Sequence, residues 1–317
     1  MFMVFLYNYF LEKASSAKII SKGIQNKMES EMNEMILVTS AAGNTGRIMV
    51  QKLVEAGFDV LATDIDPRVK KLPGIKKAMV GDLTDFYFLD EVMEDATMVV
   101  YIPPLFSPEE TLIGQKIIDK AIDYDIEHFI FVSVIHPNLT SLMQHIAKRD
   151  VEEQLIYKGM EIEFSYTILQ PMHYMHNFDP QLVAKTNEYR IFYDLGSPVG
   201  YVATEDVAEV VIKILNDPEK HNKATYELVG TKAYTPNELV DMFNQITGKK
   251  AKAVFLFIDE FLNEIDATDL YVRAGFRHLA YAYTSWGLDG NTNVLTWLLG
   301  REPTSFEEYV KMKLNKK

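Results

Sequence analysis

A run of small residues near the start of the chain has the composition of a phosphate-binding loop. The run Ser40-Ala-Ala-Gly-Asn-Thr-Gly46 follows the apolar residues 36–38 and precedes apolar side chains at helical spacing. In such a strand–loop–helix unit, backbone N–H groups at the helix start point at an anion, and the helix dipole favours negative charge there. A dinucleotide fingerprint has three glycines, whereas here Ser40 takes the first position and only Gly43 and Gly46 match.

A carboxylate follows at the spacing expected for a ribose ligand. The segment Asp59-Val-Leu-Ala-Thr-Asp64 reads as a second strand, and its last residue lies about 20 residues beyond the loop. Asp64 can accept from both ribose hydroxyls of NAD but repels the 2′-phosphate of NADP, so NAD(H) is the preferred cofactor. Arg68 follows shortly after and keeps NADP(H) open as the alternative. A strand, turn and helix without any ligand is the purely structural alternative.

The first half of the chain alternates between strand and helix patterns. Short apolar runs indicate strands at 36–38, 59–64, 77–80, 97–102, 129–133 and 166–169, and helical patterns include 108–124 and 141–157. Alternation at this pace implies parallel strands with right-handed crossovers. We therefore predict an α/β fold with a doubly wound parallel Rossmann-type sheet, which binds ligands at the carboxyl ends of its strands.

The second half is predicted to form a smaller C-terminal α/β substrate lobe. It contains strand patterns at 226–229 and 253–257, and helical patterns at 206–215, where Asp206 is the expected N-cap, and at 236–246. Aromatic residues crowd the segment 271–286, which suits a helical lid, a flat aromatic acceptor site, or both. The expected division is an NAD(P)-binding Rossmann domain at 35–170 and a substrate lobe at 171–317 that partly returns to the Rossmann sheet.

Composition limits the classes of function. The chain has 317 residues, of which 48% are hydrophobic and 24% charged, as in a globular protein with a sizeable core. A net charge of −13 opposes direct contact with nucleic acid or an anionic membrane. No cysteine is present, which excludes disulfides and thiolate chemistry and fits a reducing compartment, so we expect a cytoplasmic protein.

Residues 1–34 are expected to be separate from the globular part. Their first eleven residues are apolar and aromatic but too short to span a bilayer. An added or mis-assigned leader is the preferred interpretation. An amphipathic surface appendage and a membrane anchor are the alternatives.

Several motifs, in order, carry a family resemblance. From residue 35 to about residue 313 the chain resembles the NmrA-like branch of the atypical short-chain dehydrogenases/reductases, including its NAD(P)H:quinone-reductase-like members. No single motif is decisive, but their order is specific. The matching pieces are 40–46, Gly81-Asp82-Leu83, 128–137, His145-Ile-Ala-Lys148, 166–177, Asp206-Val-Ala208 and 300–306.

The resemblance assigns cofactor contacts to particular positions. It implies that the pyrophosphate lies on Ala42, Gly43, Asn44, Thr45 and Gly46, with Ser40 beside them. It also implies that Asp82 and Leu83 border the adenine, that Ile102, Pro103 and Ser133 flank the nicotinamide, and that Pro171 and Met172 form the outer wall. The same residues have plain structural explanations: Asp82 suits a helix start, and Pro103 simply ends a strand.

The expected catalytic helix departs from that of ordinary dehydrogenases. Their tyrosine and lysine lie one helical turn apart, whereas here Gln144 stands four residues before Lys148 and cannot act as an acid. Lys148 is the candidate catalytic residue, holding the ribose and nicotinamide. The alternative is a surface ion pair with Glu152.

Histidines are the remaining polar candidates near the expected substrate. His136, His145 and His173, together with Met172, are predicted to line the substrate pocket. His173 and His176 have a spacing that can present two imidazoles to a metal, but no third ligand is apparent from local spacing, so no metal is predicted.

The absent tyrosine shapes the predicted function. Reduction of a ketone needs a proton in the transition state, whereas a reduced quinone is a delocalised anion that can take its proton from solvent. The leading prediction is an NAD(P)H-dependent reductase of small aromatic, quinone-like or conjugated acceptors. A catalytically silent dinucleotide sensor that regulates a partner protein is the rival, and reduction of a small carbonyl compound with a bound water as acid is a third reading. A homodimer or a regulatory protein partner remains open.

Overall fold

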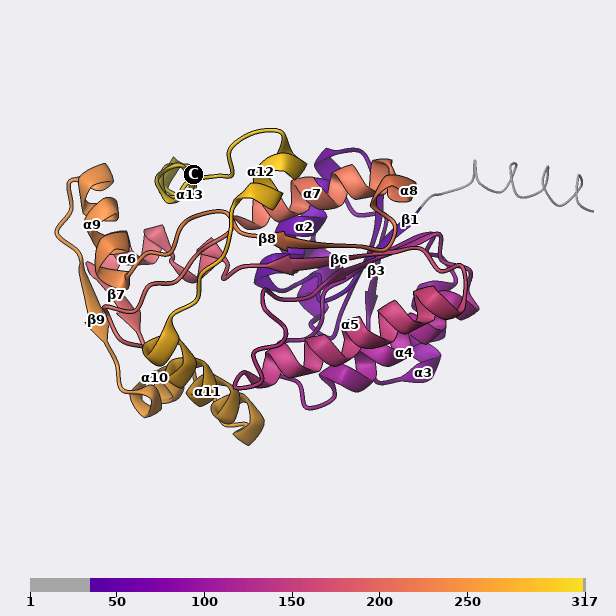
Figure 1. Ribbon diagram of the computed structural model, residues 1–317, viewed down its shortest axis with the longest axis horizontal. Helices are drawn as coiled ribbons and strands as arrows, with labels where there is room; N and C mark the ends of the chain where they lie inside the picture. Colours follow the sequence, from indigo (N-terminus) through magenta and orange to yellow (C-terminus); the bar gives the residue numbers. More distant parts are fainter. Residues whose placement is uncertain (1–34, 316–317) are drawn as a thin grey trace, which may run out of the picture.

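The computed structural model describes residues 35–315, which form a parallel sheet between two helical layers and a second lobe beside it (Figure 1). The expected segment at 1–34 lies outside the described residues. Seven strands pair in the order β3-β2-β1-β4-β5-β6-β8, all parallel, which confirms the doubly wound Rossmann-type prediction. They are β1 (Met35–Val38), β2 (Asp59–Asp64), β3 (Lys77–Val80), β4 (Met98–Tyr101), β5 (His128–Val132), β6 (Tyr166–Pro171) and β8 (Ala224–Leu228).

The central strands are buried on both faces. Every residue of β1, β4, β5 and β6 is buried, which is why these strands read as apolar runs without a polar alternation. The edge strand β3 is only partly buried. Strand order reverses between β1 and β4, so the crevice expected for a ligand lies beyond the carboxyl ends of these two strands.

Helices cover the sheet on both faces (Figure 1). One layer contains α2 (Asn44–Glu55), α7 (Thr204–Asn216), α8 (Pro218–His221) and α12 (Asn293–Leu299). The other contains α3 (Phe86–Met93), α4 (Glu110–Asp123) and α5 (Met143–Glu161). Short 3₁₀ turns, η1 (Pro67–Lys71) and η2 (Met175–Asn177), follow β2 and β6. Alternate strand residues therefore enter two separate cores, one under each layer.

The second lobe is built around two further parallel strands, β7 (Glu188–Ile191) and β9 (Lys252–Phe255). Its helices are α6 (Pro180–Thr186), α9 (Pro236–Thr247), α10 (Ile258–Glu264), α11 (Leu270–Trp286) and α13 (Phe306–Asn315). Phe178 joins them, because its ring contacts those of Tyr189, Phe243 and Phe306. Residues 171–317 are not confined to this lobe, since they also supply β8 and α7 to the Rossmann sheet.

The expected helix cap at Asp206 is wrong. Helix α7 begins at Thr204, so Asp206 lies inside its first turn, fully buried. Its carboxylate instead accepts from the Arg301 guanidinium at 2.8 Å and from the Thr304 backbone N–H at 2.7 Å. The Asp206 carboxylate, which local spacing assigned to a helix cap, thus forms long-range contacts with the segment before α13 instead.

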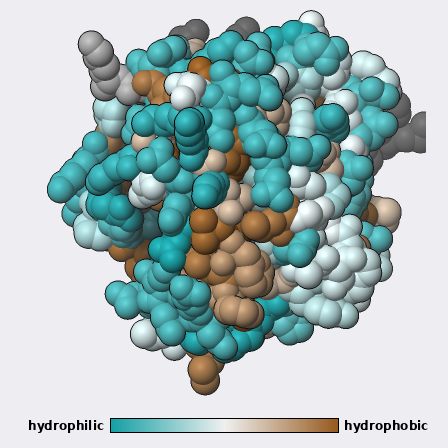
Figure 2. Space-filling view, turned by 90° about the vertical axis from the view of Figure 1, so that its left-hand side faces the viewer, coloured by the Kyte–Doolittle hydropathy of each residue, from teal (hydrophilic) through white to brown (hydrophobic). Residues whose placement is uncertain are grey.

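The outer face of the second lobe carries apolar residues. Figure 2, which views the molecule from that side, shows hydrophobic side chains gathered near the middle of a largely hydrophilic face. Phe255 and Phe257, at and just beyond the end of β9, are exposed, and their rings lie 5.5 Å apart. Within residues 35–315, no helix is both long enough and apolar enough to cross a membrane.

Candidate functional site

The loop between β1 and α2 is anchored to the end of β4. Ser40, at the first position of the glycine fingerprint, has a positive φ of 48°, a conformation that glycine adopts without strain. Its hydroxyl donates to the Ile102 carbonyl at 2.9 Å, and the Thr39 hydroxyl donates to the same carbonyl at 2.8 Å. These bonds hold the serine in the left-handed conformation that the turn requires.

Gly43 and Gly46 both lie close to the Ser40 backbone, and Gly46 lies much closer. A Cβ on Gly46 would lie 2.1 Å from the Ser40 carbonyl oxygen, whereas a Cβ on Gly43 would lie 3.2 Å from that atom. Gly43 is the N-cap of α2 and has no side chain with which to cap the first N–H groups. The start of α2 therefore presents backbone donors to an external acceptor.

Asp64 links the loop to the turn after β2. One carboxylate oxygen accepts from the Ala42 N–H at 2.9 Å, and the other accepts from the Asp66 N–H at 2.9 Å. Each oxygen retains a second lone pair, so the carboxylate can still accept from a ligand hydroxyl. Asp64 is thus placed to fix the loop geometry and to face a ligand.

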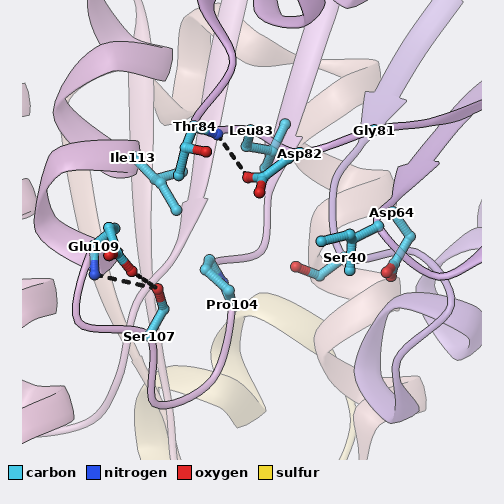
Figure 3. A pocket seen from close by; sticks show the side chains of 11 residues that line it. Ser40, Asp64, Gly81, Asp82, Leu83, Thr84, Pro104, Ser107, Glu109 and Ile113 are labelled. Atoms are coloured by element: carbon cyan, nitrogen blue, oxygen red, sulfur yellow. Dashed lines mark hydrogen bonds between the residues drawn. The ribbon is translucent and has the colours of Figure 1, made fainter. Parts of the chain in front are cut away.

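A cavity of about 330 Å³ lies at the carboxyl ends of β1 to β4. Figure 3 shows Ser40 and Asp64 on one side of it and Ser107 and Glu109 on the other, with Pro104 between them. The cavity brings together Ser40, Asp64, Asp82 and Leu83, four residues predicted as cofactor contacts. Its lining residues are Ser40, Asp64, Ile65, Gly81, Asp82, Leu83, Thr84, Pro104, Ser107, Glu109 and Ile113.

Sequence reasoning missed one wall of this cavity. Ser107 and Glu109 come from the loop after β4, where the Ser107 hydroxyl accepts from the Glu109 N–H at 3.2 Å and donates to its carboxylate at 3.1 Å. The only available signal was the Ser-x-Glu turn before a helix, which is common in proteins without ligands. Asp82 meanwhile accepts from the Thr84 N–H at 2.9 Å, so it also serves its own turn.

Lys148 is buried and paired with a residue from the neighbouring helix. Its Nζ lies 2.5 Å from Oε1 of Glu110, in the first turn of α4, and the two side chains are only 10% and 2% exposed. The alternative expectation of a surface pair with Glu152 is wrong, since the partner comes from another helix. Burial raises the pKa of the Glu110 carboxyl, and the Lys148 charge offsets part of that rise.

Glu152 forms a second buried polar cluster one turn along α5. It accepts from the Ser133 hydroxyl and from the Gln170 amide, the latter at 2.9 and 3.0 Å to its two oxygens. Burial raises the pKa of Glu152, and these hydrogen bonds lower it in part. Ser133, predicted to flank the nicotinamide, is therefore buried at the end of β5 with its hydroxyl on a carboxylate.

Replacement of Glu152 by glutamine is expected to make stability less dependent on pH. Because the folded-state pKa is raised, the stabilisation from the protonated carboxyl is complete below about 4.3, the ordinary pKa of glutamate, and is lost as pH rises through the raised value. Glutamine does not ionise. As the pH rises from 4 to 8, the free energy of unfolding of Glu152→Gln should therefore increase relative to that of wild type.

Urea unfolding at both pH values measures this difference. The neighbouring Glu153 is exposed, so Glu153→Gln is the matched control and should follow the wild-type pH dependence. An identical pH dependence for Glu152→Gln and wild type would contradict the prediction.

The predicted substrate histidines occupy different environments. His136 lies on the loop after β5 with a positive φ of 49°, and its Nε2 donates to the Asp289 carbonyl at 2.8 Å. His145 is buried on α5, where its Nδ1 donates to the His136 carbonyl at 3.0 Å and burial lowers its pKa to about 4. It is therefore a neutral imidazole near pH 7.

His173 is enclosed by the second lobe. Its Nδ1 lies 3.2 Å from the Tyr283 hydroxyl and its Nε2 lies 3.0 Å from the Asn177 amide, and burial lowers its pKa to about 3. Met172, the preceding residue, is buried beside it. His176 bonds instead to Thr204. No group of three metal-binding side chains occurs within residues 35–315.

The aromatic segment of α11 packs against the loop after β4. Phe276 lies 4.8 Å from the Phe106 ring and also contacts Phe192 and Phe261. On the same helix Tyr281 is exposed whereas Tyr283 is buried. Through α11 the second lobe thus packs aromatic side chains against the loop that carries Pro104.

Comparisons with known proteins agree with this architecture. The sequence profile of the NmrA-like family matches residues 32–311. An NmrA-like family domain-containing protein from Dictyostelium discoideum is 22% identical over 307 residues, covering 90% of this chain and 99% of its own length.

Two solved structures share the fold. The NADPH-dependent quinone oxidoreductase QOR2 from Escherichia coli, complexed with NADPH, aligns with a TM-score of 0.71 at 18% identity, covering 89% of this chain and 100% of its own. NmrA, a negative transcriptional regulator, in complex with NAD, aligns with a TM-score of 0.68 at 16% identity, covering 88% and 94%. The first of these structures is thus a quinone oxidoreductase by name and the second a transcriptional regulator, and each is a complex with a nicotinamide dinucleotide.

Proposed function

The chain belongs to the NmrA-like family, and from that premise we propose that it binds a nicotinamide dinucleotide and reduces quinone-like or conjugated acceptors with it. The β1–α2 loop would hold the pyrophosphate, and the cavity beside Asp64 and Asp82 would hold the adenosine. We assign NAD(H) as the preferred coenzyme and residues 171–317 as the acceptor-binding lobe. A cytoplasmic location suits both the coenzyme and the cysteine-free sequence.

The residues present fit such a coenzyme. The absence of a Cβ at Gly46 lets the first turn of α2 pack directly on the Ser40 backbone, which keeps the N–H donors of the helix start beside the loop, where they would face a phosphate. Asp64 retains lone pairs for ribose hydroxyls, and Leu83 with Ile113 gives the cavity apolar surface for a base. When bound, the coenzyme supplies the hydride.

Around the reacting end, the described residues offer positioning groups in place of the tyrosine acid of ordinary dehydrogenases. Ile102 and Pro103 follow β4, Pro171 is the last residue of β6 and Met172 comes directly after it, so these residues would form the wall on the nicotinamide side. Gln144 is buried one turn before Lys148 and donates no proton as an acid. His145 and His173 are neutral because burial lowers their pKa to about 4 and about 3.

Within residues 35–315, Gln144 occupies the position one turn before Lys148 where ordinary dehydrogenases have a tyrosine, and this observation carries the choice of acceptor. A ketone would leave an alkoxide that needs a proton during hydride transfer. A quinone accepts hydride to give a delocalised anion, which then takes its proton from solvent. QOR2, a quinone oxidoreductase by name, has the same fold and supports this assignment by analogy.

A dinucleotide sensor without catalysis is the second candidate. It is favoured by the two buried carboxylates, because Glu110 engages Lys148 and Glu152 engages Ser133. Those are the polar groups that would otherwise face the nicotinamide. NmrA, a regulator that holds NAD, supports this reading by analogy.

A binding titration followed by a turnover assay tests the proposal. Quenching of protein fluorescence is measured with NADH and NADPH, and oxidation of the reduced coenzyme is then followed with a panel of quinones and matched simple ketones. We expect saturable binding, tighter for NADH, and turnover of quinones only. Binding without turnover would favour the sensor. Failure to bind either coenzyme would contradict both functions.

A further inference from the structure

The turn after β2 contains an arginine that is held by its own neighbour. The Arg68 guanidinium contacts one oxygen of Asp66 through both Nε and Nη2, each at 2.6 Å. The other Asp66 oxygen accepts from the Arg68 backbone N–H at 2.8 Å, as the N-cap of η1. Three contacts therefore join these two residues.

This pair is attached directly to the cavity. The Asp66 N–H donates to the carboxylate of Asp64, which also accepts from the Ala42 N–H in the phosphate-binding loop. On this side the cavity wall consists of Asp64 and Ile65, and Arg68 is directed onto Asp66 rather than contributing to the wall. The guanidinium thus lies just outside the edge where the ribose of a bound adenosine would sit.

We propose that Asp66 sets coenzyme choice by holding the Arg68 guanidinium away from the site of a 2′-phosphate. The inference rests on the proposed dinucleotide function and concerns only its specificity. Asp64 repels a 2′-phosphate, and an arginine at this edge could compensate by bidentate contact. Asp66 prevents that compensation, because its carboxylate both holds the Arg68 guanidinium in place and neutralises its charge.

The proposal predicts a gain of NADPH affinity on loss of one charge. Asp66→Asn keeps a side-chain oxygen that caps η1, since asparagine is as good an N-cap as aspartate, but it removes the ion pair. We expect the dissociation constant for NADPH to fall about tenfold relative to that for NADH, the size of effect expected for one charge near a phosphate. Fluorescence titration of both coenzymes measures the ratio without requiring turnover.

Further variants show whether Arg68 is responsible. Adding Arg68→Met to Asp66→Asn should abolish the gain and restore the wild-type ratio of NADPH to NADH affinity. Arg68→Met alone should weaken NADPH binding, because it leaves the Asp66 carboxylate unpaired beside the ribose position. Asp59 is the matched control: it lies at the other end of β2, pairs with Lys76 at 3.0 Å and has similar exposure, so Asp59→Asn should not alter the ratio.

Three outcomes would overturn the inference. An unchanged ratio of the NADPH and NADH dissociation constants in Asp66→Asn would show that the Asp66–Arg68 ion pair has no role in the choice of coenzyme. A double variant, Asp66→Asn with Arg68→Met, that binds NADPH much more weakly than wild type would show that Arg68 already reaches the 2′-phosphate. Binding of neither coenzyme to the wild-type protein would overturn the proposed function as well, which separates that failure from the first two.

Discussion

Gly46→Ala is expected to weaken dinucleotide binding by about 100-fold or more, because the methyl group would occupy the space of the loop backbone. The added Cβ would lie 2.1 Å from the Ser40 carbonyl oxygen and 2.7 Å from the Ala41 Cα, and neither atom belongs to a flexible side chain. The loop must therefore move away from α2. That movement would misplace the N–H donors to the phosphates, and hydrogen bonds to charged groups contribute about 1.5–3 kcal/mol each.

Two other glycines show whether the effect comes from the close approach. At Gly43 the added atom would meet the same oxygen at 3.2 Å, so Gly43→Ala should weaken binding less. At the exposed Gly196 the nearest atom belongs to the Asp194 side chain, at 3.1 Å, so Gly196→Ala should bind as wild type. Thermal melts identify any variant that has lost its fold. Wild-type affinity in a folded Gly46→Ala protein would contradict the phosphate-binding role of the loop.

Lys148→Met is expected to destabilise the protein by about 3–5 kcal/mol, the usual cost of leaving one buried charge unpaired. Its partner Glu110 is only 2% exposed, and within residues 35–315 its carboxylate forms its ion pair with the Lys148 ammonium. Burial already raises the pKa of Glu110 and loss of Lys148 would raise it further. The loss of stability should therefore be largest at high pH and be relieved as pH falls.

Urea unfolding of single and double variants isolates the pair. Lys148→Met with Glu110→Gln should recover much of the lost stability, since no buried charge then remains. Lys158 on the same helix forms an exposed pair with Glu161 at 3.5 Å, so Lys158→Met should cost less than about 1 kcal/mol. Equal losses at the two lysines would contradict the importance of burial.

The same variants separate a structural lysine from one that acts on the coenzyme. If Lys148 leaves Glu110 to hold the ribose, Glu110→Gln should tighten NADH binding, whereas the double variant should weaken it. If the pair is only structural, the double variant should bind NADH as wild type does. NADH binding by the double variant therefore decides whether Lys148 holds the coenzyme or only pairs with Glu110.

Much of the fold was predictable because its signals are local. The buried strands are short apolar runs, the helices repeat apolar residues at helical spacing, and their alternation predicts a doubly wound parallel sheet. The expected strand at 59–64 matches β2. The expected helix at 141–157 begins two residues before α5 and ends within it. Differences at element ends arise because terminal turns depend on neighbouring contacts rather than on periodicity.

Parts of the candidate site were also predictable, because loop and ligand contacts share one segment. Gly43 is the N-cap of α2, Gly46 lies in the first turn of that helix, and Asp64 ends the next strand at the expected spacing. Ser40 was correctly identified as a departure from the glycine pattern. Its compensation by a hydrogen bond to Ile102, 62 residues away, had no sequence signal.

The sequence by itself determined the order of strands and helices, the glycine loop and the carboxylate that follows it, because each depends on residues within a few positions of one another. Only the tertiary structure decided the partners of the buried charges. Lys148 meets Glu110, 38 residues away, because α4 and α5 lie side by side, and Asp206 meets Arg301, 95 residues away, because the chain returns to α7. A buried charge must find its counter-charge in whatever element packs against it, and that neighbour is set by the topology of the whole chain.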